Sequence, residues 1–493
     1  MSTAEVAGTR TETDFLGELA LPESALWGIH TARALQNFPI SDVPLHAHPE
    51  LIRALGQIKL AAVRANRELG LIDPVVAAAI ESAAAEVATH RLDRFFVVDV
   101  IQGGAGTSTN MNANEVIANR ALELLGHRPG AYDVVHPIDH VNRCQSTNDV
   151  YPTAIRLALV RVLDELAGRV LACVEALRDK GEEFAEVLKI GRTQLQDAVP
   201  MTVGREFRGW AVTLSEELPR LRETRALLAE VNLGGTAIGT GITAPPAYSV
   251  LVCRHLAQLA DMPIVPAADL VEATSDTGVF VLVSGAIKRV AVKLSKICND
   301  LRLLGSGPQA GFGELRLPSR QAGSSIMPGK VNPVIPEVVN QVAYAICGND
   351  VSITMAAESG QLQLNAFEPL VAHRLLEGTR WLARALGTLT ENCIEGIDVD
   401  RARLTAEVER SVGVVTALAP VIGYATASEI AKAALRGEGT VRELVLGTGL
   451  LGEAELAALL LPSVLCGHDP DLSEEDDPVA LARGLMVGAS LRW

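Results

Sequence analysis

The chain has 493 residues and a formal net charge of −16 at pH 7, and 48% of its residues are apolar while only 4% are aromatic. This length allows about three domains, and the composition favours helices packed on helices over sheets. The negative charge argues against nucleic acid or an anionic membrane as a partner, because both select basic surfaces. A site for an anionic substrate must therefore supply its own local cations.

The cysteines and the N-terminal stretch indicate the compartment. Seven cysteines are scattered singly, without the paired spacing of a metal site. The stretch MSTAEVAGTRTETDFLG lacks the apolar core of a signal peptide. No segment reaches the roughly 18 apolar residues that a membrane-spanning helix needs. We therefore expect a soluble, cytoplasmic protein.

The predicted fold is all-α, with three domains. Residues 1–146 show short helices and loops and form an N-terminal mixed, mostly helical domain. Residues 147–402 hold the long helices of a central bundle. Residues 403–493 form a small C-terminal helical domain with an acidic tail, DPDLSEEDDP, at residues 469–478, which is typical of a solvated linker.

Apolar stripes predict three long helices in the central domain. The first stripe follows Pro152, and its residues recur at spacings of four and three; they are Ile155, Leu159, Val162, Leu166, Val170, Cys173 and Leu177. The second alternates in the same way; its residues are Phe280, Val283, Ile287, Val290, Leu294, Ile297 and Leu301. The third begins near Glu337. Because long helices with a second apolar face usually need another chain, we expect a homo-oligomeric bundle. No fixed-period repeat supports the alternative, a monomeric helical solenoid.

Four polar stretches stand out against this apolar background: GGAGTSTNMN (103–112), QSTND (145–149), GRTQLQDAVP (191–200) and GSSIMPGKVNP (323–333). Singly, each has an ordinary explanation, such as a helix cap for QSTND or a flexible loop for GGAGTSTN. Together they supply hydroxyl and amide donors with a lysine, which is what a small dicarboxylate requires. No GxSxG motif, nucleotide fingerprint or other cofactor motif is present.

These stretches, in this order and spacing, resemble the aspartase/fumarase superfamily over about residues 12–465, and GSSIMPGKVNP matches its signature loop. QSTND, GRTQLQDAVPMT, KICNDLRLLGSGP and QLQLNAFEPL are similar to the aspartase branch. The resemblance implies a reversible anti-elimination that releases ammonia from L-aspartate and gives fumarate. It also implies no metal or organic cofactor at the reacting centre, while activation by a divalent cation elsewhere is left open.

The resemblance assigns roles to individual residues. It implies that Ser324 is the base that removes the β-proton. The implied substrate-binding residues fall into three groups. The donors to the β-carboxylate are Thr107, Ser146, Thr147 and Ser325. The partners of the amino group or the other carboxylate are Asn148 and Thr193. The anchors of the α-carboxylate are Lys330 and Asn332.

Gln194, which the resemblance also places among the substrate-binding residues, departs from the fumarase pattern. Fumarases and some aspartases carry a histidine there, with a glutamate partner that Glu337 matches. Because hydroxide must be protonated to leave whereas ammonium already carries its proton, glutamine favours deamination. Arg33 matches an arginine near the substrate in this superfamily; a structural ion pair is the other reading.

The resemblance further implies a homotetramer in which each active site gathers residues from three chains. Two other functions stay open at this point. One is a class II fumarase or a lyase acting on a substituted aspartate. The other is a catalytically silent structural paralogue, against which stands the presence of every expected polar residue.

Overall fold

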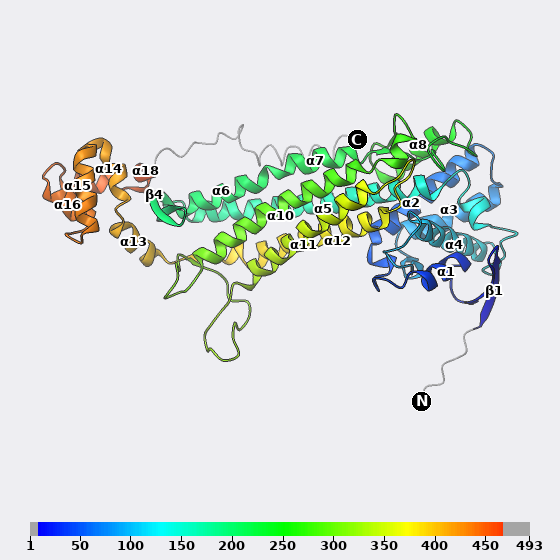
Figure 1. Ribbon diagram of the computed structural model, residues 1–493, viewed down its shortest axis with the longest axis horizontal. Coiled ribbons are helices and arrows are strands. Elements are labelled where there is room, and N and C mark those ends of the chain that lie inside the picture. The colour runs from blue at the N-terminus through cyan, green and yellow to red at the C-terminus, as the bar shows by residue number, and fades with distance from the viewer. Residues whose placement is uncertain (1–7, 467–493) are drawn as a thin grey trace.

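The computed structural model describes residues 8–466. It is elongated, with the N-terminal elements at one end, long helices in the middle and small helices at the other end (Figure 1). The all-α prediction is confirmed, since every sheet in the described part has only two strands. Between residues 8 and 466, no helix is both long and apolar enough to cross a membrane.

The N-terminal end begins with a hairpin of β1 (Thr9–Asp14) and β2 (Gly17–Pro22). Its helices are α1 (Ile29–Asn37), α2 (Pro49–Glu68), α3 (Pro74–Ala88) and α4 (Thr107–Leu124), with one-turn helices at Leu45–Ala47 and Asp93–Phe95 and a π-helical turn at Pro137–Val141. Alanine and branched aliphatic residues let these helices pack closely around α2, whose Ile52, Leu55 and Ile58 are fully buried.

The middle of the molecule is a bundle of long helices, α5 (Thr147–Glu183), α6 (Val203–Ser215), α7 (Glu217–Leu227), α10 (Gly278–Leu304), α11 (Val334–Glu358) and α12 (Glu368–Asn392). The smaller elements between them are β3 (Leu188–Thr193), β4 (Gln196–Thr202), β5 (Glu230–Val231), α8 (Tyr248–Ala260), β6 (Val265–Pro266), α9 (Glu272–Ser275) and β7 (Leu315–Arg316). The three predicted helices are present, and every residue named in the first two stripes is buried.

Pro152 lies inside α5, five residues after the start of the helix and just before the apolar stripe that begins at Ile155. Proline has no N–H, so the carbonyl of Asn148, four residues earlier, receives no helical hydrogen bond from it. The Asn232 side chain donates to that carbonyl instead, at 2.9 Å. A long-range contact therefore allows the helix to begin at Thr147.

The C-terminal end holds α13 (Arg401–Arg410), α14 (Val414–Ile422), α15 (Tyr424–Leu435), α16 (Val441–Gly447), α17 (Glu453–Leu459) and α18 (Pro462–Leu465), after a one-turn helix at Ile394–Gly396 and β8 (Asp398–Val399), which pairs with β7. These helices share a small apolar cluster of their own, which includes Val408, Leu418 and Val445. The acidic tail at residues 469–478 lies outside the described residues. The domain boundaries at 146 and 402 stay predictions.

Candidate functional site

Thr107 is the first residue of α4, so GGAGTSTNMN is only partly a loop. Gly106 precedes the helix with φ of 86°, and a Cβ there would lie 2.4 Å from the Tyr151 ring, so only glycine fits. The Thr107 hydroxyl donates to the carbonyl of Gly104 at 2.6 Å and is exposed. Thr107 is thus at the surface, while the N–H groups of Thr107 and Thr109 are already bonded, to the Gly104 carbonyl and the Gln102 side chain, both at 2.9 Å.

QSTND forms the cap of α5, as its composition predicted. The Ser146 hydroxyl accepts the N–H of Asn148 at 3.2 Å, and the Asp149 carboxylate accepts the N–H of Ser146 at 3.0 Å, which completes a capping box. The other Asp149 oxygen accepts the N–H groups of Gly234 at 3.1 Å and Thr236 at 2.9 Å. Burial raises the pKa of Asp149 to about 6 despite these hydrogen bonds.

The starts of α4 and α5 lie together. The side-chain amide of Asn110 on α4 donates to the Thr147 hydroxyl on α5 at 3.1 Å, and Asn148 holds a neighbouring loop by donating to the carbonyl of Ala237 at 2.7 Å. The structure therefore brings Thr107, Ser146, Thr147 and Asn148 to one place, where two helix N-termini favour a negatively charged group.

A buried polar network lies behind this cluster, and the sequence analysis missed it. Lys59, fully buried on α2, donates to the side-chain oxygens of Asn142 and Gln145, both at 2.9 Å. Burial lowers the pKa of Lys59 to about 7. The Asn142 oxygen also accepts from Asn110 at 3.1 Å and Asn114 at 3.2 Å. A lysine in the apolar run IKLAAV and two asparagines four residues apart were the available signals.

Thr193 and Gln194 lie at the other end of α5. They belong to the β3–β4 hairpin, where Gln194 and Leu195 form the two-residue turn with φ of 53° and 63°, as in a type I′ turn. Both side chains are exposed. Because α5 has 37 residues, it separates this hairpin from Thr147 by about 55 Å.

The base of the same hairpin contacts the segment between α10 and β7, which precedes the signature loop. Buried Lys189 forms an ion pair with buried Glu314 at 2.9 Å, and Arg192 forms an ion pair with the other oxygen of Glu314. The Arg192 guanidinium also lies 4.5 Å from the centre of the Phe312 ring. Within one chain, therefore, the hairpin that carries Gln194 contacts the segment before the signature loop, and both lie far from Thr147.

The signature loop leaves the bundle between α10 and α11 and protrudes from it (Figure 1). Its neck is closed by two hydrogen bonds, from the Gly323 N–H to the Lys330 carbonyl and from the Asn332 amide to the Gly323 carbonyl, both 2.9 Å. Inside it, the Ser324 hydroxyl oxygen accepts the N–H groups of Ile326 at 3.2 Å and Met327 at 3.0 Å. Such paired N–H groups stabilise a negatively charged oxygen.

The remaining predicted residues lie apart from these clusters. Ser325 and Lys330 are exposed on the loop. Glu337 lies in the first turn of α11, and no hydrogen bond within the described chain joins it to Gln194. Arg33 binds both oxygens of Asp14 at 2.7 Å and holds the pKa of that carboxyl at about 2. Arg33 thus forms the structural ion pair that was the alternative to a role near the substrate.

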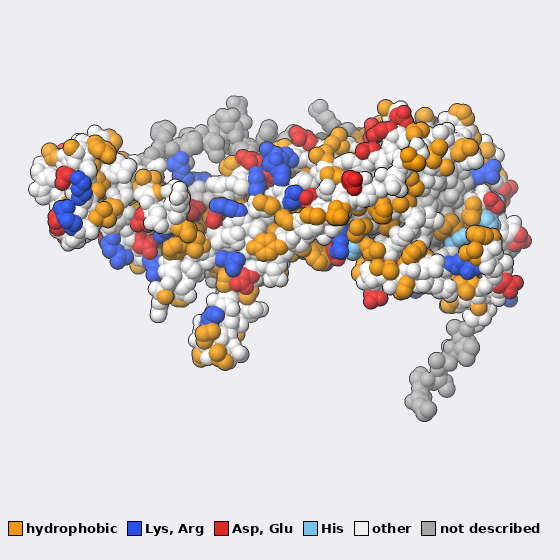
Figure 2. Space-filling view, in the orientation of Figure 1, with side chains coloured by type: hydrophobic (Ala, Val, Ile, Leu, Met, Phe, Trp, Pro, Cys, Tyr) orange, Lys and Arg blue, Asp and Glu red, His pale blue; other side chains and the backbone are white. Residues whose placement is uncertain are grey.

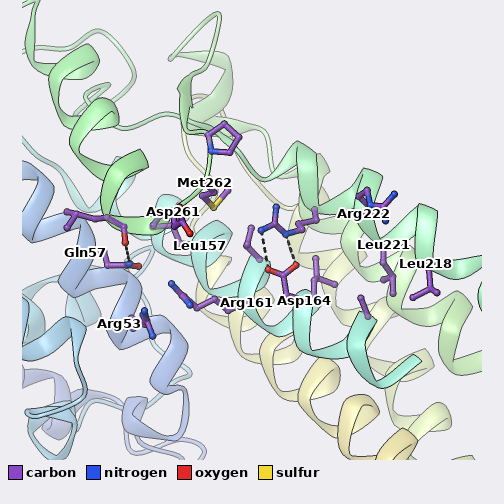
Figure 3. Close-up of a pocket in the computed structure, with 17 residues that line it drawn as sticks. Arg53, Gln57, Leu157, Arg161, Asp164, Leu218, Leu221, Arg222, Asp261 and Met262 are labelled. Carbon is purple, nitrogen blue, oxygen red and sulfur yellow. Dashed lines mark hydrogen bonds and ion pairs between the residues drawn. The ribbon is translucent and has the colours of Figure 1, made fainter. Parts of the chain in front are cut away.

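A cavity of about 660 Å³ lies between α2, α5, α7 and α8 (Figure 3). It is lined by apolar side chains and by Arg53, Arg161, Arg222 and Arg225, the last of which pairs with Asp164. None of the predicted site residues lines it. In residues 8–466, no group of three or more His, Cys, Asp or Glu side chains is arranged to hold a metal ion.

Comparisons with known proteins place the chain in a family. Residues 17–348 match the lyase family, and residues 414–467 match the fumarase C C-terminus. The chain is 57% identical to an aspartate ammonia-lyase of Pseudomonas canavaninivorans over 93% of its own length and 97% of the relative's. It is 51% identical to the aspartate ammonia-lyase of Escherichia coli K12, over 91% and 94%.

Solved structures agree with this placement. A fumarate lyase:delta crystallin from Brucella melitensis, bound to cobalt, superposes with a TM-score of 0.91 and 53% identity, and covers 94% of this chain and 100% of that one. A class II fumarase from Schistosoma mansoni superposes with a TM-score of 0.86 and 32% identity, over 96% and 100%. The chain therefore belongs to the aspartase/fumarase superfamily of lyases.

Proposed function

We propose that this chain is an aspartate ammonia-lyase, a carbon–nitrogen lyase that converts L-aspartate reversibly to fumarate and ammonia. The observation that carries the proposal is the 57% identity to an aspartate ammonia-lyase across nearly the whole of both chains. The geometry agrees with it, because neutral donors gather where α4 and α5 begin, which suits a carboxylate.

The reaction removes a weakly acidic proton from the β-carbon. Ser324, as an alkoxide stabilised by the N–H groups of Ile326 and Met327, takes this proton and becomes a hydroxyl. The electron pair delocalises onto the β-carboxylate as an aci-carboxylate and then forms the Cα–Cβ double bond, while the Cα–N bond breaks. Ser146 and Thr147 donate to the carboxylate as its charge grows, which lowers the barrier. Thr107 joins them when its hydroxyl turns from the Gly104 carbonyl to the substrate.

The other predicted residues bind the rest of the substrate. Lys330 and Asn332 hold the α-carboxylate, and Asn148 and Thr193 hold the amino group or the other carboxylate. The leaving group departs as neutral ammonia, so it needs no acid, and Gln194 suffices where a dehydrating enzyme needs a proton donor. No step requires a metal or an organic cofactor at the reacting centre.

A complete site requires several chains, and we include a homotetramer in the proposal. Within one chain α5 separates Thr147 from Gln194 by about 55 Å. Apolar side chains also lie exposed along the bundle over α10 and α11 (Figure 2); they include Leu282, Val292, Val338, Tyr344, Val351 and Met355. Neighbouring chains that cover these helices would bring each loop to another chain's α4–α5 cluster. Light scattering should then give about four times the chain mass of 52.2 kDa.

The direct test is the ultraviolet absorbance of fumarate formed from L-aspartate by the purified protein. We expect saturable fumarate production, with equimolar ammonia. No fumarate at high enzyme and substrate concentrations would reject the proposal.

The same assay separates the alternatives. Faster turnover of L-malate would favour a fumarase, and faster turnover of an N- or C-substituted aspartate would favour a lyase for that analogue. A Ser324→Ala variant that keeps the biological role of the wild type would favour a silent paralogue.

A further inference from the structure

Two asparagines on α4 make nearly the same contacts with one informative difference. Asn110 and Asn114 lie one turn apart, and both are buried, at 1% and 0% exposure. Both donate to the side-chain oxygen of Asn142, at 3.1 and 3.2 Å. Asn110 uses its amide nitrogen for a second hydrogen bond, to the Thr147 hydroxyl at 3.1 Å, whereas the second contact of the Asn114 amide is with the Met111 sulfur.

The Asn110 contact fixes what the Thr147 hydroxyl can do. A hydroxyl has one hydrogen to donate and two lone pairs that accept. The Asn110 amide nitrogen carries only hydrogens, so it occupies a lone pair of Thr147 and cannot receive the hydroxyl hydrogen. That hydrogen must point elsewhere, and it is free for the substrate carboxylate.

The orientation of Asn110 is imposed from deeper in the molecule. Lys59 donates to the oxygen of Asn142 and the oxygen of Gln145. The amide nitrogens of the same two residues donate to backbone carbonyls, that of Asn142 to Gln145 at 3.2 Å and that of Gln145 to Val141 at 3.0 Å, so both oxygens face Lys59. The Asn142 oxygen in turn selects the amide nitrogen of Asn110. This orientation leaves the Asn110 oxygen buried without a partner, which costs free energy. Lys59 and the Gln145 carbonyl together therefore fix the direction of each hydrogen bond up to Thr147.

We propose that Asn110 is a positioning residue for the elimination, oriented by Lys59 through Asn142, which makes Thr147 a donor to the reacting carboxylate. The proposal rests on the proposed function. Asn110 acts through Thr147 and does not itself touch the substrate.

The test compares the same substitution at the two asparagines. Asn110→Leu and Asn114→Leu each remove one donor to Asn142 and keep a similar volume. Since one lost donor at a developing oxyanion costs on the order of 100-fold, and Asn110 affects only the direction of that donor, we expect kcat to fall about 10- to 100-fold for Asn110→Leu. KM should change less than about threefold, and Asn114→Leu should stay within about threefold of wild type in kcat. Thermal unfolding of both variants controls for stability, and Asn110→Ala is the substitute if the leucine variant does not fold.

A double-mutant cycle separates positioning from general damage. Thr147→Val removes the hydroxyl, so adding Asn110→Leu to it should lower kcat no further. Equal losses for Asn110→Leu and Asn114→Leu, or additive losses in the double variant, would overturn the positioning role. Fumarate formation by the wild type is recorded alongside, so a protein inactive on L-aspartate contradicts the proposed function separately. In that case kcat for the double-mutant cycle is measured with the substrate that the wild type does turn over, such as L-malate.

Discussion

The first turn of α5, which carries Thr147, and the signature loop, which carries Ser324, are stabilised to very different extents. Thr147 is 9% exposed and lies on a network anchored by buried Lys59 and Asp149. The loop is held at its neck by two hydrogen bonds, and Ile326 beside Ser324 is 84% exposed. The carboxylate donors are thus preorganised by folding, which electrostatic stabilisation requires. The proposed base lies on an exposed loop, and we expect this loop to close over a bound substrate.

The largest expected effect comes from a substitution in the signature loop. Ser324→Ala removes the proposed base and leaves the α4–α5 cluster untouched. We expect kcat to fall at least about 1,000-fold, as when other catalytic nucleophiles or bases are removed. Steady-state kinetics measure the loss of catalysis, and inhibition by succinate measures carboxylate binding at the α4–α5 cluster. The inhibition constant should stay within about threefold of wild type. A variant that keeps a tenth of its kcat would assign the base elsewhere.

A substitution beside Thr147, at the start of α5, should lower the free energy of unfolding. Asp149→Ala leaves the part-buried N–H group of Ser146 and the buried N–H groups of Gly234 and Thr236 without their acceptor. Because each such group costs roughly 1–3 kcal/mol, we expect the free energy of unfolding to fall by about 3–5 kcal/mol. Urea unfolding of Asp149→Ala beside Ser324→Ala measures the contrast. Equal stability of the two variants would contradict it.

A buried carboxyl behind the turn makes stability depend on pH. Glu368 begins α12, which packs on α5, and burial raises its pKa from 4.5 to about 8. The folded chain thus holds this proton more tightly than the unfolded chain. The stability that it contributes is complete below about pH 4.5 and is lost as the pH rises to about 8.

Glu368→Gln cannot ionise, so it should gain stability relative to wild type between pH 5 and pH 8. The expected gain is on the order of 2 kcal/mol per chain. Thermal unfolding at the two pH values measures it, with Ser324→Ala as a control that should follow the wild type. The same difference between variant and wild type at both pH values would show that Glu368 does not titrate in this range.

The smallest effect sharpens the role of loop closure. Ile326 has no apolar cover in the open loop, and we expect closure to bury it. Burial of such a side chain contributes about 1.5–3 kcal/mol, part of which Ile326→Ser should lose as an approximately tenfold increase in KM. The unfolding midpoint should not change, since the side chain is exposed before substrate binds. An unchanged KM would mean that Ile326 stays exposed.

The sequence predicted the helices because their apolar stripes follow the helical period, which needs no knowledge of distant contacts. It predicted the cap at Ser146 for the same reason, since capping is local. It did not show how α5 continues through Pro152, because the carbonyl left free by the proline is satisfied by Asn232, 84 residues from Asn148. Lys59 and Asn110 were missed because buried polar residues are explained by their partners, and these lie on other helices.

The candidate site was predicted by resemblance at the level of single residues, but its assembly was not visible in composition or spacing. Thr107, Ser146, Thr147 and Asn148 do come together within one chain. Thr193 and Gln194 lie about 55 Å away, at the far end of α5. Distances of this kind depend on the length and direction of helices in the folded chain. The separation is what leads us to propose shared sites.

The measurement that tests shared sites most directly is activity in mixed tetramers. Ser324→Ala and Thr147→Val chains are each expected to be nearly inactive alone, and they are refolded together from denaturant in equal amounts. If loop and turn come from different chains, random mixing gives about a quarter of the sites both wild-type parts, and about a quarter of wild-type activity should return. If each chain supplied both parts of its own site, every site would carry one defect and the mixture would stay as inactive as its components.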